Sequence, residues 1–370
     1  MLNEWNMDKC GNYIKRLGRT YIGPNNELYM NWTCSGLSFR FRGTYLIAEM
    51  NAIPGDEVDR NPMDGSVSHR ETWPYAAVFI DDKEEPDQYF EIKGTSKQYL
   101  IWSSENEETH DIIIRKMTEN PKGKLSISRF LTDGVIECID SNSKRLNIEF
   151  IGDSITCGFG NLSSEKDRLF YSADENGWLS HAAIAARKLK ADFSIISYSG
   201  IAITKGIGNM EWYCPSMSEL YPYTDRLIEE YYDKKDSFEE WDFNGAKPDV
   251  IVLNLGTNDA TVIDFNGDHI PGILKFEEDY YQFLKLIREK NGPEPWIICT
   301  LGSMDYYLYD NILKMAHRFA EETKDTRIRC FKYGRIRLTD GYGACGHPNT
   351  KTQLRMGNEI ADYISVLLHL

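Results

Sequence analysis

The first 140 residues carry short runs of alternating apolar, β-branched and aromatic residues, and turn-forming pairs such as Pro-Gly and Asn-Pro separate the runs. This pattern is typical of antiparallel strands with one face toward a core. The spacing predicts an antiparallel β-sandwich or jelly roll. Its expected strands are 36–43, 45–50, 75–80, 88–92, 98–102, 111–115 and 125–130.

Two features of this half are less regular. The stretch 53–74 is polar and rich in Pro, Asp and Arg, which predicts a long surface loop. The aromatic residues Trp32, Trp73 and Trp102 would suit a carbohydrate-binding surface. We favour packing in a core, because a Trp in a β-rich run is usually buried.

From residue 145 onward, apolar strands alternate with segments of helical periodicity. The expected strands are 146–151, 193–198, 249–255, 296–299 and 328–331, and the expected helices are 178–190, 275–290, 309–323 and 351–368. Such alternation predicts a parallel sheet with helices on both faces. We therefore expect a β-sandwich domain over 1–141, a polar linker near Ser141, and a flavodoxin-like three-layer α/β domain over 142–370.

The sequence Gly152-Asp153-Ser154-Ile155 directly follows the first strand of the second half. A tight turn at the carboxyl end of a buried parallel strand lies where open α/β sheets bind their ligands. This context predicts that Ser154 is a nucleophile. The alternative is that Ser154 only caps the following helix.

Other suitable residues follow other strands, namely Gly200, Asn258 and His347. Because the ends of parallel strands meet at one edge of a sheet, we expect these residues to lie near Ser154. Acyl transfer needs a hydroxyl, a base and donors for the oxyanion. We assign the hydroxyl to Ser154, the base to His347, and the oxyanion hole to the backbone N–H groups of Ser154 and Gly200 and the amide of Asn258.

Each of these residues also has a structural interpretation. Gly200 can simply end a strand, Asn258 can hold a turn through its own side chain, and a histidine before proline can shape a loop. Among the other histidines, His269 is the second candidate base because it lies in an expected loop. Four suitable residue types at four strand ends favour the catalytic interpretation.

The net charge and the distribution of cysteines limit the expected partners and the expected cellular location. The formal net charge of −15 argues against nucleic acid and anionic membranes as partners, and no apolar stretch is long enough to cross a bilayer. The eight cysteines are scattered without a Cys-x-x-Cys motif, and residues 1–20 lack the apolar core of a secretory signal. We expect a cytoplasmic protein with reduced thiols and no metal site.

The order of the motifs resembles the SGNH (GDSL-type) hydrolase superfamily. Its blocks are present as Gly-Asp-Ser-Ile at 152–155, Ser-Gly at 199–200, Gly-Thr-Asn-Asp at 256–259 and His-Pro at 347–348. With a sandwich before the hydrolase domain, the chain is similar to carbohydrate esterase family 2, whose members remove O-acetyl groups from plant polysaccharides and their oligosaccharides. The resemblance implies the same roles for Ser154, His347, Gly200 and Asn258, and no metal or organic cofactor.

The chain departs from this family at the acid of the triad. SGNH enzymes usually carry an acidic residue three positions before the histidine, and some members of the esterase family carry one two positions before it. These positions are Ala344 and Cys345 in this sequence. Some group must accept the Nδ1–H of His347 to fix its tautomer. We expect a Ser-His dyad with a backbone carbonyl as the orienting acceptor, a variant also known in this esterase family, and Asp340 is the alternative.

The expected function is that of a serine acetyl esterase acting on hemicellulose-derived xylan or mannan oligosaccharides, with Trp212, Tyr213 and Tyr306 as an aromatic rim for the sugar. Packing is the alternative role of these three residues. The competing functions are an SGNH lipase or thioesterase, which needs an apolar acyl groove, and a catalytically weakened carbohydrate-binding protein. An acetylated oligosaccharide is the expected partner, and self-association as a homo-oligomer stays open.

Overall fold

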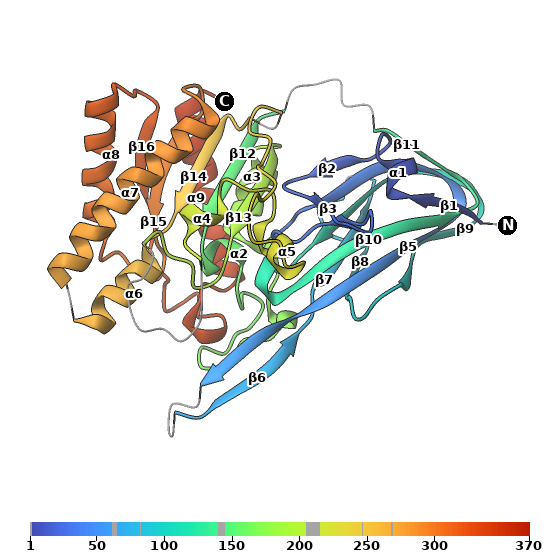
Figure 1. Ribbon diagram of the computed structural model, residues 1–370, viewed down its shortest axis with the longest axis horizontal. Helices are drawn as coiled ribbons and strands as arrows, with labels where there is room; N and C mark the ends of the chain where they lie inside the picture. Colours follow the sequence, from blue (N-terminus) through green and yellow to red (C-terminus); the bar gives the residue numbers. More distant parts are fainter. Residues whose placement is uncertain are drawn as a thin grey trace. The chain divides into compact units, whose positions relative to one another are not determined.

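The computed structural model describes residues 2–60, 65–81, 83–139, 145–204, 215–245, 247–267 and 269–370. The chain forms two compact units (Figure 1). The first comprises Met1–Lys144 and Tyr171–Glu175, and the second comprises Arg145–Phe170 and Asn176–Leu370. The segment Tyr171–Glu175 therefore belongs to the first unit although it follows Ser154 in the sequence.

The first unit is built on one 11-stranded antiparallel sheet with the central order β3-β4-β10-β5-β9-β7-β8. Buried apolar side chains from these strands form a single core cluster. The antiparallel β architecture expected for this half is confirmed. The strands are β1 Asn3–Asn6, β2 Lys15–Leu17, β3 Tyr21–Ile22, β4 Leu28–Tyr29, β5 Gly36–Arg60, β6 Val67–Thr72, β7 Tyr75–Ile80, β8 Gln88–Glu91, β9 Lys97–Lys116, β10 Gly123–Thr132 and β11 Val135–Glu137.

Several strands that were expected to be separate are continuous. The strand β5 contains both 36–43 and 45–50, with a shift of register between Gly43 and Tyr45. At this point the carboxylate of Asp133 accepts the backbone N–H groups of Thr44 and Tyr45, at 3.1 and 2.9 Å. A side chain from a neighbouring turn thus satisfies the backbone where Gly43 was expected to end the strand.

The prediction of a long surface loop over 53–74 is wrong. The strand β5 continues to Arg60, and the chain returns as β6, antiparallel and in register from Gly55 opposite Thr72 (Figure 1). Cross-strand polar contacts join the two strands: Asp59 forms an ion pair with Arg70 at 3.0 Å, and the carboxylate of Asp56 lies 2.7 Å from Nδ1 of His69. The polar residues that suggested a loop are these cross-strand partners.

The three tryptophans of the first unit lie in or against its core. Trp32 is 1% exposed, and Trp73 and Trp102 pack on the core cluster while partly buried. Their burial supports the packing interpretation over an exposed carbohydrate-binding surface.

The second unit is a five-stranded parallel sheet in the order β13-β12-β14-β15-β16. This is the strand order of flavodoxin-like folds, as expected. The strands are β12 Asn147–Gly152, β13 Asp192–Ser197, β14 Val250–Asn254, β15 Trp296–Leu301 and β16 Ile328–Lys332. Each lies within two residues of its expected position or extends it, because continuous apolar runs mark strands buried on both faces.

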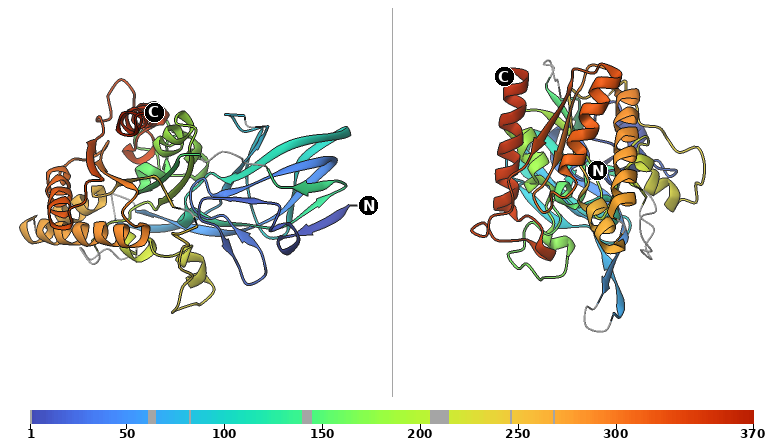
Figure 2. Two further views of the ribbon diagram at one scale, coloured as in Figure 1. Left: turned by 90° about the horizontal axis from the view of Figure 1, so that it is seen from above. Right: turned by 90° about the vertical axis from the view of Figure 1, so that its left-hand side faces the viewer.

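Helices cover both faces of this sheet. The helix α3 packs against α9, and α7 packs against α8. Figure 2 shows α9 on one side of the sheet and α7 and α8 on the other. The helices are α1 Met7–Cys10 of the first unit, and α2 Ser154–Cys157, α3 His181–Lys188, α4 Met217–Leu220, α5 Arg226–Tyr231, α6 Thr257–Asn266, α7 His269–Asn291, α8 Tyr309–Thr323 and α9 Thr350–Leu368 of the second.

Two helices begin elsewhere than expected. The helix α3 starts at His181 because Gly177–Leu179 forms a separate 3-10 turn and Ser180 caps α3. The helix α7 starts at His269, six residues before its expected start at 275. It tolerates Pro271 because the first turn of a helix needs no intrahelical bond from its N–H groups.

Candidate active site

Ser154 lies at the junction of β12 and α2. The carboxylate of Asp153 caps α2 by accepting the N–H of Ile155 at 2.9 Å, so Ser154 is the first helical residue and not the cap. A side chain at Gly152 would place its Cβ 2.0 Å from the hydroxyl of Thr156. The glycine is therefore favoured in this turn, which leaves Ser154 8% exposed at the strand's carboxyl end.

The hydroxyl of Ser154 meets the imidazole of His347. The distance from Oγ to Nε2 is 2.9 Å. The ring of Phe159 packs against the imidazole with ring centroids 4.6 Å apart. This contact and the hydrogen bond hold Nε2 of His347 within the distance at which an imidazole can accept a proton from a hydroxyl.

The other imidazole nitrogen faces backbone carbonyls. Nδ1 of His347 lies 3.3 Å from the oxygen of Ala344 and 3.2 Å from that of Cys345. Cys345 has the left-handed conformation, with φ 52° and ψ 32°. The carboxylate of Asp340 lies 3.4 Å from the guanidinium of Arg355. The described contacts of Nδ1 are thus with backbone carbonyls, and the carboxylate of Asp340 contacts Arg355.

The turn that precedes His347 is held by the loop that follows α2. Three consecutive N–H groups of the turn donate to carbonyls of this loop: Ala344 to Gly160 at 3.0 Å, Cys345 to Arg168 at 3.1 Å and Gly346 to Lys166 at 2.9 Å. Two segments far apart in the sequence thereby fix the carbonyls that orient His347.

The residues expected in the oxyanion hole lie on two connected segments. Gly200 is exposed in the loop after β13, with φ 82°. Asn258, in the first turn of α6, donates its amide to the carbonyl of Ile201 at 2.8 Å. An amide NH₂ has two donors, and within the described part of the chain only the carbonyl of Ile201 accepts from it, which leaves the other donor for a ligand. The N–H of Ser154, at the first position of α2, has no intrahelical acceptor.

Two buried carboxyl groups lie behind this edge. Burial and the neighbouring charge of Asp259 raise the pKa of Asp153 to about 7, although the N–H of Ile155 opposes this shift. Burial raises the pKa of Asp259 to about 6, against hydrogen bonds from the backbone of Thr204 and Ile203. Near neutral pH Asp153 is therefore partly protonated, whereas Asp259 is largely ionised.

The expected aromatic rim is only partly described. Trp212 and Tyr213 lie outside the described residues. Tyr306 is half-buried, and its hydroxyl donates to the carbonyl of Tyr333 at 2.7 Å. The next residue, Tyr307, is 48% exposed, and its hydroxyl lies 3.2 Å from Nδ1 of the second candidate base, His269. Tyr307 is therefore a better candidate for the aromatic rim than Tyr306, because its ring is more exposed.

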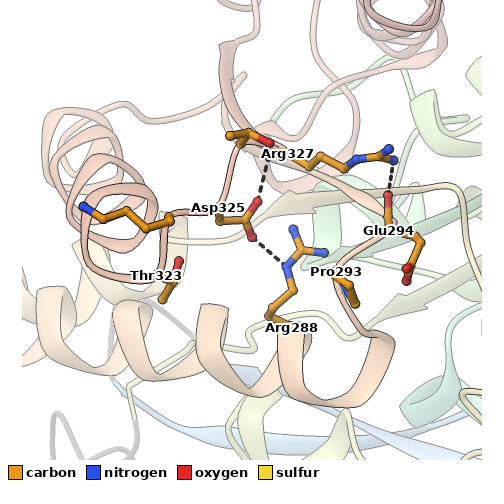
Figure 3. Close-up of a pocket in the computed structure, with 8 residues that line it drawn as sticks. Arg288, Pro293, Glu294, Thr323, Asp325 and Arg327 are labelled. Carbon is orange, nitrogen blue, oxygen red and sulfur yellow. Dashed lines mark hydrogen bonds and ion pairs between the residues drawn. The ribbon is translucent and has the colours of Figure 1, made fainter.

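A pocket of about 420 Å³ lies at the opposite edge of the same sheet (Figure 3). It is lined by the end of α7, the segment before β15 and the connection from α8 to β16. Nε of Arg288 pairs with Asp325 at 2.7 Å. These residues precede β15 and β16, whereas Ser154 follows a strand, so the pocket is separate from the candidate active site.

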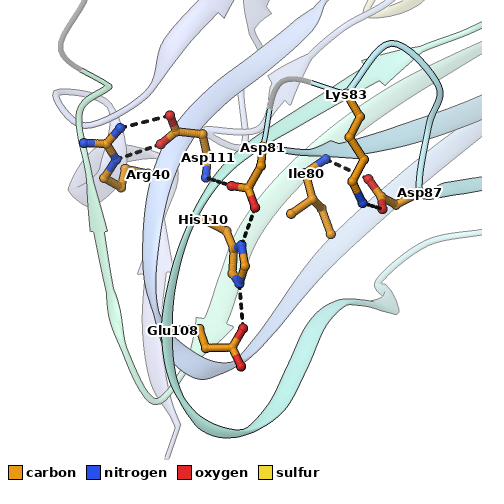
Figure 4. A network of polar contacts seen from close by, with 8 residues as sticks. All are labelled: Arg40, Ile80, Asp81, Lys83, Asp87, Glu108, His110 and Asp111. Carbon is orange, nitrogen blue, oxygen red and sulfur yellow. Dashed lines mark hydrogen bonds and ion pairs between the residues drawn. The ribbon is translucent and has the colours of Figure 1, made fainter.

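A polar network in the first unit centres on His110 (Figure 4). Its Nδ1 lies 2.7 Å from Asp81 and its Nε2 3.0 Å from Glu108. Burial lowers the pKa of His110, but the two carboxylates outweigh burial and raise it overall. The imidazole of His110 lies between two carboxylates and has no hydroxyl or thiol partner in this network, so the network does not supply a pair of nucleophile and base.

Two known protein families match this chain, one within each half of the sequence. Residues 16–138 match the family described as carbohydrate esterase 2 N-terminal, and residues 148–360 match the GDSL-like lipase/acylhydrolase family. No helix among the described residues is long and apolar enough to span a membrane.

Curated relatives are carbohydrate-active esterases. The chain is 29% identical over 279 residues to the cellulase/esterase CelE of Acetivibrio thermocellus, covering 73% of this chain and 32% of CelE. It is 32% identical over 184 residues to an acetylxylan esterase / glucomannan deacetylase of Cellvibrio japonicus, covering 45% of this chain and 47% of the relative. The chain thus spans less than half the length of these two relatives.

A solved structure matches nearly the whole chain. It is a family two carbohydrate esterase from Clostridium thermocellum in complex with cellohexaose. The TM-score is 0.78 at 25% sequence identity, and the match covers 96% of this chain and 99% of that chain.

Proposed function

We propose that this chain, which belongs to the GDSL-like lipase/acylhydrolase family and carries a carbohydrate esterase 2 N-terminal domain, is a serine esterase that removes O-acetyl groups from carbohydrate. The observation that carries the proposal is the 2.9 Å contact between the Ser154 hydroxyl and Nε2 of His347. The names of its relatives support a carbohydrate ester as the substrate.

The reaction proceeds through an acetyl-enzyme. Nε2 of His347 accepts the proton of Ser154 as Oγ attacks the acetyl carbonyl. The N–H groups of Ser154 and Gly200 and the amide of Asn258 stabilise the oxyanion. His347 then protonates the departing sugar oxygen, and a water activated by the same imidazole hydrolyses the acetyl-serine.

The orienting group in this mechanism is the backbone. Nδ1–H of His347 donates to the carbonyl oxygens of Ala344 and Cys345. Neutral carbonyls stabilise the imidazolium less than a carboxylate does, but they fix the same tautomer. A dyad of this kind therefore retains the base and the oxyanion hole, which supply most of the catalysis.

For the substrate we propose acetylated xylan or mannan oligosaccharides. The exposed ring of Tyr307 offers an apolar face of the kind that a sugar ring packs against. We further propose a cytoplasmic location, in which the substrates are imported oligosaccharides. The seven cysteines among the described residues are free thiols, as that compartment favours.

The test is a comparison of ester substrates. Acetate release is measured from acetylated xylo-, manno- and cello-oligosaccharides, and hydrolysis of long-chain acyl esters is measured in parallel. Preference for the acetylated sugars, lost in Ser154→Ala, supports the proposal. Preference for long acyl chains would make the chain a lipase, and sugar binding without acetate release would make it a carbohydrate-binding protein.

A further inference from the structure

Two cysteines lie opposite each other on neighbouring strands of the parallel sheet. Cys299 of β15 and Cys330 of β16 are paired residues in the ladder, and both are free thiols. Paired residues of adjacent strands point to the same face of the sheet. The spacing of adjacent strands, about 4.8 Å, falls within the Cα separation of about 4.4 to 6.8 Å that a disulfide spans.

The two thiols differ in their surroundings. Cys299 is fully buried, whereas Cys330 is partly exposed. The hydrogen bond between the thiols raises the pKa of Cys299, which burial raises further, and lowers the pKa of Cys330. The accessible thiol is therefore also the one with more thiolate, which is the combination that reacts with oxidants.

We propose that Cys299 and Cys330 form a reversible thiol–disulfide pair, in which Cys330 reacts with a small-molecule disulfide and Cys299 resolves the mixed disulfide. With glutathione disulfide, the Cys330 thiolate attacks one sulfur and releases one glutathione thiolate. Cys299 then loses its proton and attacks the Cys330 sulfur, which releases the second glutathione. Two protein thiols are oxidised and one glutathione disulfide is reduced to two thiols.

The position of β16 at the end of the sheet favours a reversible closure. Within the described sheet β16 is the last strand and pairs with β15 alone, so its spacing from β15 is not fixed from a second side. The partial exposure of Cys330 also gives a reducing thiol access to the bond, and exposed disulfides are the labile ones.

The loops that follow β15 and β16 lie at the edge of the sheet that carries Ser154. The loop after β15 contains Tyr306, whose hydroxyl donates to the carbonyl of Tyr333 directly after β16. In addition, the N–H of Ile336 donates to the carbonyl of Ser303 at 3.4 Å. The loops that follow the two strands are thus tied together, close in sequence to the cysteine pair.

Peptide mapping of the folded protein tests the pair. The protein is incubated with glutathione disulfide, blocked with an alkylating reagent and digested. We expect a Cys299–Cys330 cross-link that dithiothreitol removes, whereas the exposed Cys138 and Cys345 carry glutathione without this cross-link. In Cys299→Ser, glutathione should remain on Cys330. A stable glutathione adduct on Cys330 of the wild type, or no reaction of Cys330 while Cys138 reacts, overturns the proposal.

A second measurement does not depend on cross-linking. The rate at which iodoacetamide modifies Cys330 is followed against pH. Cys299→Ala removes the thiol donor and should move the midpoint to higher pH, whereas Cys299→Ser, which keeps a hydroxyl donor, should restore part of the shift. The same midpoint in all three proteins would show that Cys299 does not activate Cys330.

Discussion

The carboxylate of Asp259 accepts a hydrogen bond from the backbone N–H of Thr204, with 2.9 Å between oxygen and nitrogen. Its second oxygen accepts the N–H of Ile203 at 3.2 Å, and the adjacent Asn258 binds the carbonyl of Ile201. Two consecutive residues of α6 thus hold the segment that follows Gly200. Asp259 is buried, and we expect it to position the donors of the oxyanion hole.

Replacing Asp259 by Asn should lower kcat more than it changes KM. The amide offers one acceptor where the carboxylate offers two, so one of the two buried N–H groups loses its partner, at a cost of about 1–3 kcal/mol in the free energy of unfolding. Kinetics on an acetylated oligosaccharide and urea unfolding measure both effects. Asp264→Asn, an exposed position on the same helix, is the control. An unchanged kcat in Asp259→Asn would show that this segment does not position the oxyanion hole.

Replacing Asp340 by Asn tests which group orients His347. Its carboxylate lies 3.4 Å from Arg355, and Nδ1 of His347 faces carbonyls instead. We expect kcat to change by less than about threefold, since a partly exposed ion pair contributes little. A fall of about 10⁴-fold, as on removal of a triad carboxylate, would assign the orienting role to Asp340.

Replacing Gly160 by Ala should displace the turn that carries the acceptors of His347. The new Cβ would lie 2.7 Å from Cβ of Ala344, at a backbone φ of 60°. Gly267→Ala is a matched control because it has a similar φ, 66°, and open space around the Cβ position. Both substitutions strain the backbone, but only Gly160→Ala should lower kcat. Equal kcat values in the two variants would show that the loop after α2 does not position His347.

The sequence allowed the second unit to be predicted in most of its elements. Apolar runs bounded by glycine located all five parallel strands, and strand ends pointed to Ser154 and His347, which lie within hydrogen-bond distance. Predictions from the local sequence pattern were wrong where residues distant in the sequence determine the structure. The strand β5 continues past Gly43 because Asp133 supplies acceptors, and the hairpin of β5 and β6 is joined by cross-strand polar contacts that no periodicity reveals.

Two features of the candidate site could not be predicted from the sequence either. The contacts of Asp259 and the exposure of Tyr307 depend on segments that the fold brings together, and the residues next to them in the sequence do not indicate either feature. The absence of an acid before His347 did predict carbonyl acceptors, because the sequence alone shows that Ala344 and Cys345 carry no carboxylate.

Buried His181 should make folding sensitive to acid. Burial lowers its pKa from 6.5 to about 4, although Gln353 opposes the shift. The unfolded chain therefore binds a proton between these pH values that the folded protein does not, so stability is full above about pH 6.5 and falls as the pH decreases toward 4. The loss amounts to about 3 kcal/mol. Urea unfolding of the wild type and His181→Gln across this range measures it, and equal slopes in the two proteins would contradict it.

In our proposal Ser154 and His347 form the catalytic dyad of an acetyl esterase, and the rate of acetate release from an acetylated oligosaccharide measures what each contributes. The wild type is compared with Ser154→Ala, His347→Ala and His269→Ala, all checked for folding. We expect kcat to fall by on the order of 10⁴-fold or more in the first two variants and to stay close to the wild-type value in His269→Ala. Normal acetate release by His347→Ala, or its loss in His269→Ala alone, would contradict the account.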